Sequence, residues 1–407
     1  GIANLEVAVV HLHNGPWAAR RTLDGGAVPR VTPMLDDGVS GVGEPKRLRG
    51  NANLAFQGSI VLGMGFVLTP EEATELIERN PRNKDVLFPY INGEDLNSRP
   101  DQSPSRWVIN FLDWPLEREG APKGYSGPVA ADYPECLEIV RTRVKPERDL
   151  VKRDRNRERW WIYAENRPGL RAALRPLKTV LGHGFVSKYL AFGWAPATCV
   201  FAGPMNVVTT ESLAAFAVLQ SSVHEIWVRA RSSSLETRMR YLPFDHFETY
   251  AFPRPKDLQL ESLFAIGGSF AEARHGTCHA RQRGVTSVYN LLHDPDTERD
   301  EALVQKSTPP FDDVRRLRSL QVDLDHAVLV AYGWDDLDSR HDFYRGRDAG
   351  TGLAEDDFRF TIHPETRAEI LRRLLALNHE RATEEEATLE RGGEIPSAFS
   401  WLSDNRS

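Results

Sequence analysis

Short apolar runs, separated by Gly, Pro and charged residues, dominate the first half of the chain. Runs of this kind, bounded by turn residues, predict β-strands. The predicted strands cover residues 4–13, 55–64, 86–91, 107–111, 179–181, 185–194, 199–201 and 207–209. Longer stretches with helical spacing lie at 213–229, 311–332 and 363–388. The pattern predicts an α+β fold, in which a β-rich unit with inserted helices precedes a mainly helical region.

Two predicted helices carry end signals. Thr69, Pro70 and Glu72 form the N-cap, the first helical position and the partner of a capping box, so a helix is predicted over 70–79. Gly333 follows the apolar stretch 311–332 as a C-terminal cap would. The basic stretch 132–155 is predicted to be helical as well.

The composition is that of an ordinary globular protein. The chain has 407 residues, of which 41% are hydrophobic and 27% charged, enough for two or three cores. No run approaches the roughly 18 apolar residues of a membrane span. Three cysteines lie far apart, which argues against a disulfide framework and predicts a cytoplasmic location.

Several patterns resemble parts of catalytic or metal sites but are incomplete. Thr308-Pro309-Pro310-Phe311 imitates the catalytic loop of amino-methyltransferases, with Thr where Asn should accept a hydrogen bond from the target amino group. Asp37 with Glu44-Pro45-Lys46 contains the residue types of a metal-dependent nuclease site. In such nucleases the Glu-x-Lys pattern lies on a central strand, where Pro45 would remove a backbone hydrogen-bond donor. His275, Cys278 and His279 form half of a zinc site. We therefore predict no catalytic residue and no metal site in this chain.

Gly63-Met64-Gly65, ahead of the first helix, is the one candidate for a nucleotide-type cofactor site. Missing side chains at such a turn let the backbone approach a ligand. A single GxG is weak, and no acidic ribose partner stands on the next strand. An independent small-molecule enzyme built around this turn is the alternative function, and we predict no cofactor in this chain.

A series of segments in one order carries a resemblance to a known family. They are FQGS (56–59), VLGMGF (61–66), FPYINGEDLN (88–97), SRWVINF (105–111), VKPER (144–148), WWIY (160–163), RPGL (167–170), VSK (186–188), SSSLETR (232–238), FETYAFP (247–253), AYGW (331–334) and LALNH (375–379). The order resembles the target-recognition and C-terminal region of MmeI-like (type IIL/IIG) restriction–modification enzymes and related adenine-specific methylases, including the phage-exclusion type. The resemblance covers roughly residues 4–380.

The resemblance implies a division of the chain and a function. Residues 1–52 would be the edge of a methylase domain and a connector, 53–255 a DNA target-recognition domain, and 256–407 a mainly helical C-terminal region. The nuclease and the Asn-Pro-Pro-Tyr methylase precede this region in the family, so the chain alone is expected neither to cleave nor to methylate DNA. The implied partners are double-stranded DNA and a methylase domain or subunit that uses S-adenosylmethionine.

Charge along the chain suggests where DNA would be held. The net charge is −7, yet nine Lys or Arg stand against four acids between Arg141 and Arg159. Such a run suits phosphate contacts, because the phosphate backbone supplies most of the affinity for DNA. The alternative is a solvated helix with internal ion pairs. The predicted DNA-binding residues here are Arg148, Lys152, Arg153 and Arg155.

Sparse polar positions among the later strands are predicted to contact DNA more selectively. Hydroxyl, imidazole, ammonium and guanidinium groups can meet phosphates or base edges. These predicted residues are His183, Ser187, Lys188, Ser232, Ser233, Ser234, Arg238 and Arg240. Gln57 and Arg106 are weaker candidates. Trp160, Trp161 and Tyr163 are expected to be core anchors rather than stacking platforms, since large aromatics dominate core burial.

Overall fold

Two four-stranded sheets form the centre of the protein in the computed structural model, which describes residues 15, 20–23, 26–28, 44–232, 239–298, 311–345 and 358–402. The strand orders are β10-β5-β6-β4 and β3-β11-β7-β9. Neighbouring strands are antiparallel except β10 and β5. The strands are β3 (Ala55–Gln57), β4 (Val67–Leu68), β5 (Leu87–Ile91), β6 (Arg106–Ile109), β7 (Thr179–Gly184), β9 (Gly193–Pro196), β10 (Val200–Phe201) and β11 (Met205–Val208).

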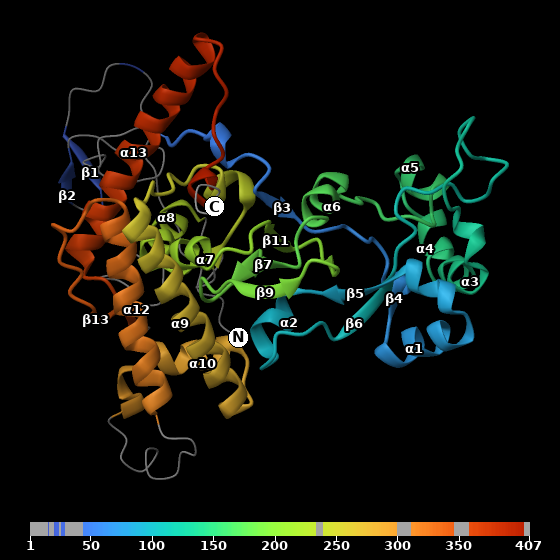
Figure 1. The fold of residues 1–407 in the computed structure, drawn as a ribbon, viewed down its shortest axis with the longest axis horizontal. Coiled ribbons are helices and arrows are strands. Elements are labelled where there is room, and N and C mark those ends of the chain that lie inside the picture. Colours follow the sequence, from blue (N-terminus) through green and yellow to red (C-terminus); the bar gives the residue numbers. More distant parts are fainter. Residues whose placement is uncertain are drawn as a thin grey trace.

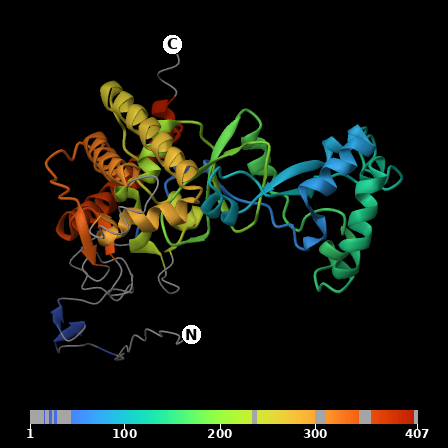
Figure 2. The same cartoon turned by 90° about the horizontal axis from the view of Figure 1, so that it is seen from below.

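The sheet β3-β11-β7-β9 separates the two main cores. Side chains alternate between the faces of a strand. Leu181 and Val208 point into a core shared with the long helices, whereas Val180 and Val207 point into a core shared with the other sheet. The sheet therefore joins the two ends of the elongated molecule in Figures 1 and 2.

At one end lies a lobe, defined as residues 61–85 and 112–165, that carries α1 (Pro70–Arg79) and three short helices (Figure 1). The predicted capping box of α1 is confirmed. Thr69 Oγ1 accepts from the amide of Glu72 at 3.2 Å, and Glu72 Oε2 accepts from the amide of Thr69 at 2.9 Å. Ala73 and Leu76 bury the inner face of the helix.

The basic stretch in this lobe is not one helix, as the sequence suggested. It forms α3 (Pro134–Arg143), α4 (Lys145–Asp149) and α5 (Asp154–Glu158). Pro146 lies in the first turn of α4, where its missing amide hydrogen costs nothing, but the same residue disrupts a helix that continues from α3. The predicted helix 213–229 is likewise two helices, α7 (Leu213–Gln220) and α8 (Ser222–Arg231). Ser221 between them has an extended backbone, and its hydroxyl accepts from the amide of His224.

The other end of the molecule is a helical body around α7 and α8 (Figure 1). Its outer helices are α9 (Asp257–Arg281), α10 (Val285–His293), α12 (Asp312–Ala331) and α13 (Pro364–Glu390). The last two confirm the predicted helices, and Gly333 has the positive φ of a C-terminal cap. Further elements are α2 (Gly93–Ser98), α6 (Pro168–Leu174) and the paired strands β1 (Arg21–Leu23) with β2 (Gly26–Val28), β8 (Val186–Ser187) with β12 (Met239–Arg240), and β13 (Asp342–Arg345) with β14 (Phe358–Thr361).

The predicted strand 4–13 and the Thr308-Pro309-Pro310 pattern lie outside the described residues. The predicted strand 55–64 shortens to β3. Beyond it, Ser59 and Ile60 form only isolated bridges, and the chain turns at Leu62 and Gly63, both with positive φ. None of the helices in the described ranges combines the length and the apolar character needed to cross a membrane. The fold is α+β, as predicted.

Candidate nucleic-acid interface

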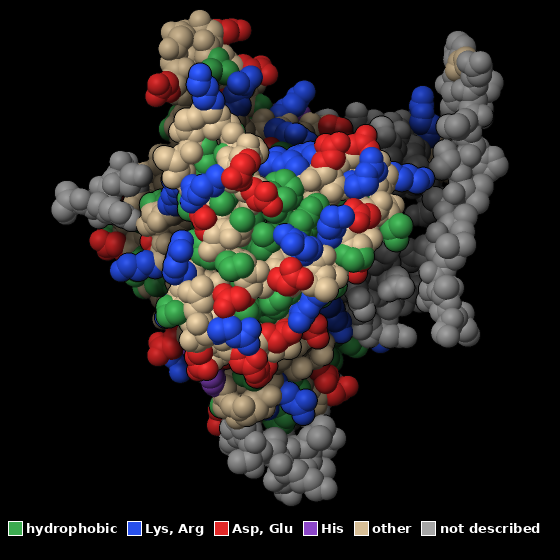
Figure 3. Space-filling model, turned by 90° about the vertical axis from the view of Figure 1, so that its right-hand side faces the viewer, with side chains coloured by type: hydrophobic (Ala, Val, Ile, Leu, Met, Phe, Trp, Pro, Cys, Tyr) green, Lys and Arg blue, Asp and Glu red, His purple; other side chains and the backbone are tan. Residues whose placement is uncertain are grey.

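Four of the nine cations of the basic run form ion pairs within the lobe. Arg143 lies 2.7 Å from Glu72, Lys145 lies 2.8 Å from Asp149, and Arg141 lies 3.8 Å from Glu138. Arg157 pairs with Asp154. Figure 3, which views this end of the molecule, accordingly shows acidic and basic side chains intermingled rather than a uniformly basic face.

Three predicted DNA-binding residues remain available in this run. Lys152, Arg153 and Arg155 are exposed. No hydrogen bond or ion pair of their side chains occurs within the described ranges of the chain. They sit between α4 and α5 and at the start of α5, so they are free to approach a phosphate backbone.

Arg148 corrects the prediction for its own position. Its side chain is 1% exposed, and its guanidinium donates to the carbonyls of Val61 (2.8 Å), Ile162 (3.3 Å) and Asn156 (3.4 Å). Burial lowers the pKa of this guanidinium. The group ties the turn before α1 to α4 and the chain after α5, and it is out of reach of DNA.

His183 and Ser187 are also buried, which corrects the prediction that they contact DNA. His183 lies between the rings of Phe192 and Tyr241, at centroid distances of 5.1 and 5.4 Å, and burial lowers its pKa to about 4. Ser187 Oγ donates to the carbonyl of Tyr189 at 2.8 Å. Both side chains are part of the core beneath β8 and not of the protein surface there.

Lys188, directly after β8, keeps its ammonium group at the surface. The nitrogen lies 3.2 Å from Asn290 Oδ1 on α10 and 5.3 Å from the centre of the Tyr189 ring. Two arginines, Arg229 from α8 and Arg359 from β14, donate to its carbonyl oxygen, each at 3.3 Å. Nothing in the local sequence marks Asn290 or Arg359, because both reach Lys188 only through the tertiary fold.

The serine-rich segment leads from α8 to β12, the partner strand of β8. Ser232 Oγ donates to the carbonyl of Arg240 at 3.0 Å, which holds the two ends of the segment together. Arg240 is exposed and Ser232 half-buried. Ser233, Ser234 and Arg238 lie outside the described residues, so their predicted contacts stay predictions.

The weaker candidates are engaged within the protein. Gln57 donates to the carbonyl of Gly203 and accepts from Arg167, and the Arg106 guanidinium lies over the Tyr90 ring. The aromatic segment is a core anchor, as predicted: Trp160 and Tyr163 are buried, and half-buried Trp161 donates to the carbonyl of Trp114.

The turn Gly63-Met64-Gly65 packs against protein, which disfavours a cofactor site. A Cβ on Gly65 would lie 2.7 Å from backbone and side-chain atoms of Arg143, and one on Gly63 would lie 3.2 Å from a Glu147 oxygen. These glycines let the chain pass close to the end of α3 and to α4.

The other sequence patterns do not assemble into a metal centre in the described ranges. No group of three or more His, Cys, Asp or Glu side chains there could hold a metal ion. Glu44 instead pairs with Arg231 at 3.1 Å. His275 and His279 touch on α9, whereas Cys278 is buried in the core.

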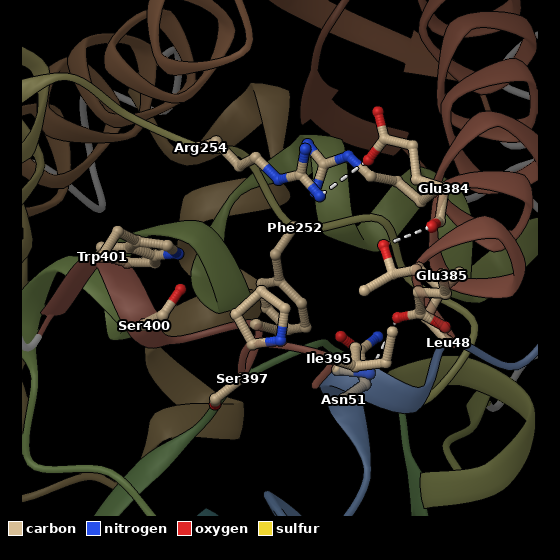
Figure 4. Close-up of a pocket in the computed structure, with 15 residues that line it drawn as sticks. Leu48, Asn51, Phe252, Arg254, Glu384, Glu385, Ile395, Ser397, Ser400 and Trp401 are labelled. Atoms are coloured by element: carbon tan, nitrogen blue, oxygen red, sulfur yellow. Dashed lines mark hydrogen bonds and ion pairs between the residues drawn. The ribbon is translucent and has the colours of Figure 1, made fainter. Parts of the chain in front are cut away.

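A cavity of about 430 Å³ lies where residues 48–51 meet residues 395–401 (Figure 4). Arg254 pairs with Glu384 across it at 2.9 Å, and Glu385 accepts from the amides of Arg49 and Gly50. The amide of Ala398 donates to the carbonyl of Gly50. Its charges are balanced, so the cavity marks the closure of the connector onto α13 rather than an anion site.

Comparisons with known proteins show which proteins the chain is similar to. Residues 186–254 match the model of the MmeI target recognition domain. Among solved structures, the type IIL restriction–modification enzyme MmeI in complex with DNA is similar, with a TM-score of 0.59 at 16% identity. The match covers 88% of this chain and 39% of that one. No curated protein matches in sequence. The resemblance found in the sequence is thus confirmed: residues 186–254 match a target recognition domain of the MmeI type, and the fold of the chain is similar to that of part of a type IIL enzyme.

Proposed function

We propose that this chain recognises a specific sequence in duplex DNA on behalf of an adenine-N6 methyltransferase of a restriction–modification or phage-defence system. The observation that carries the proposal is the match of residues 186–254 to a target recognition domain, in the segment that holds half-buried Lys188 and exposed Arg240. Lys188 directly follows β8 and Arg240 lies in β12, and these paired strands are a rigid support for side chains that read bases.

The two predicted groups of residues would make different kinds of contact with DNA. Lys152, Arg153 and Arg155 would contact phosphates, which provide affinity without sequence information. Lys188 and Arg240 would contact base edges, which provide selectivity. The separation of the two groups, one in the lobe and one beside the helical body, would let the chain hold a duplex at more than one point.

Methyl transfer would depend on a methylase domain or subunit that binds S-adenosylmethionine. This chain spans 39% of the solved relative, and the backbone at Gly65 packs closely against Arg143. We therefore expect the purified chain neither to methylate nor to cleave DNA. Methylation of adenine by the purified chain with S-adenosylmethionine would contradict this expectation.

Binding of labelled duplexes of random sequence at two salt concentrations tests the proposal. We expect weak binding at low salt that falls steeply at higher salt, because each phosphate contact contributes about −0.9 to the slope of log affinity against log salt. Absence of binding at low salt, or binding that salt leaves unchanged, would contradict it. A rise in melting temperature with S-adenosylmethionine, without DNA binding, would favour the small-molecule enzyme instead.

A further inference from the structure

The side chains of Lys188 and Asn290 meet at the boundary between the target recognition domain and the helical region. Asn290 lies on α10 and is exposed. Its Oδ1 is within 3.2 Å of Lys188 Nζ and 2.7 Å of the Tyr189 hydroxyl. One amide oxygen thus holds two neighbours that belong to a different part of the sequence.

The chemistry of these neighbours fixes the orientation of the amide. A lysine ammonium can only donate hydrogen bonds, so the oxygen of Asn290 and not its nitrogen must face Lys188. The amide nitrogen then points away from the pair. It has no hydrogen-bond partner in the described part of the chain. Lys188 and Asn290 together present an ammonium group and an amide N–H₂, which are donors only.

The pair rests on a rigid, buried support. The Arg359 guanidinium lies 4.3 Å from the centre of the Tyr189 ring, and His293 stacks against the same ring at 5.0 Å. Tyr189 and Arg359 are each 3% exposed. Because Arg359 and Arg229 also hold the Lys188 carbonyl, the lysine backbone and the tyrosine that positions Asn290 are fixed before any ligand arrives.

We propose that Lys188 and Asn290 form a composite site that reads a guanine through its O6 and N7 atoms in the major groove. Guanine is the base whose major-groove edge offers two adjacent acceptors. Adenine and cytosine present an amino donor there, which would leave a donor of the site facing a donor. The inference rests on the proposed function and deepens it, because it names the base and adds a reader from outside residues 186–254.

Selection of duplexes from a randomised library tests the site with the full chain and its variants. We expect the wild-type chain to require guanine at one position, with binding about 10-fold weaker for other bases there. Lys188→Ala and Asn290→Ala should lose that preference and keep the others. Replacing that guanine by 7-deazaguanine removes the N7 acceptor and should weaken wild-type binding, while Asn290→Ala should be less sensitive.

Asn290→Asp is the sharper variant because it keeps the shape of the side chain. One carboxylate oxygen would still hold Lys188, and the other would offer an acceptor where the amide offered donors. The preferred base should therefore change from guanine toward cytosine, whose N4 amino group is a donor. Ser287→Ala, an exposed change on the same helix, is the matched control and should leave the selected sequences unchanged.

The outcomes separate this inference from the proposed function. Variants that fold, as judged by circular dichroism, but weaken binding to every sequence equally would show a phosphate contact and overturn the guanine assignment. Unchanged preferences in both alanine variants would also overturn it. A wild-type chain that binds duplex DNA without selecting any sequence would overturn the proposed function, and the guanine assignment with it.

Discussion

The lobe and the region around β8 and β12 hold their polar groups in opposite ways. In the lobe, charged residues are dense along the sequence. Arg141, Arg143 and Lys145 nevertheless form ion pairs, and Arg148 is buried in the core. Around β8, polar residues are sparse, yet Lys188 is held by neighbours that leave its ammonium group at the surface.

The difference shows that charge density in a sequence is a poor measure of charge available to a ligand. Exposed ion pairs on neighbouring helical turns neutralise one another at little gain in stability. A single cation over a buried aromatic support can be placed more reproducibly than a run of flexible arginines. Under the proposed function, the lobe would therefore make sequence-independent contacts, and the β8–β12 region selective ones.

The largest expected contrast between the two regions is their response to acid. Burial lowers the pKa of His183 to about 4, of His224 to about 3 and of His246 to about 4, and all three surround the β8–β12 region. Unfolded histidine takes up a proton near pH 6.5, so stability is lost as the pH falls from about 6.5 toward 4. Each histidine should cost about 2 kcal/mol of unfolding free energy at pH 5.

Hydrogen-exchange protection factors at pH 7 and pH 5 measure this contrast region by region. Protection around 181–247 should fall at pH 5. Residues 61–165 contain no histidine, so protection in the lobe should change little. Equal loss in both regions would show that the molecule opens as one unit and that the acid response is not local.

The sequence predicted the elements whose signals are local. Thr69 and Glu72 form hydrogen bonds with each other within one turn, so the position of α1 could be predicted from its own sequence. The same holds for the end of α12 at Gly333. The division of the basic stretch into three helices was missed, although Pro146 lies within it. The mixed charges along 141–159 are typical of one exposed helix.

The candidate site was predicted only in part, because burial depends on contacts that are distant in sequence. Arg148 faces Val61, 87 residues away, and the environment of Lys188 comes from Asn290 and Arg359, 102 and 171 residues away. Family resemblance could identify the recognition segment, but no local pattern shows which cation in it reaches solvent.

The second contrast lies within the lobe, between two cations four residues apart. Arg148→Met removes hydrogen bonds to three carbonyls and leaves them buried without donors, so we expect a loss of about 3 kcal/mol in unfolding free energy. Lys152→Met changes an exposed side chain and should stay within about 0.5 kcal/mol of the wild type. Urea unfolding of both variants gives the comparison, and similar stabilities would show that Arg148 is not a structural residue.

A smaller effect, on binding rather than stability, is expected from the free cations of the lobe. Lys152→Ala and Arg153→Ala should weaken binding to all duplex sequences alike, and each should reduce the salt slope by about one, because one fewer phosphate is neutralised. Circular dichroism serves as the folding control. A change in the selected sequence would instead place these residues among the readers and remove the distinction between the two regions.

The smallest expected effect tests whether ion pairs within the lobe make its cations unavailable for contacts with DNA phosphates. Asp149→Asn removes the acid that holds Lys145 at 2.8 Å, and Lys145 lies in the same basic run as Lys152. Both partners are largely exposed, so removal of the pair should cost less than about 1 kcal/mol of stability. The released ammonium group should raise affinity for random duplexes about twofold at low salt and steepen the salt slope, because one more cation can displace counterions.

Glu138→Gln, which releases Arg141 from a longer ion pair of 3.8 Å, should have a weaker effect of the same sign. Weaker binding in either variant would show that the acids order the lobe for DNA, so that the ion pairs belong to the interface instead of competing with it.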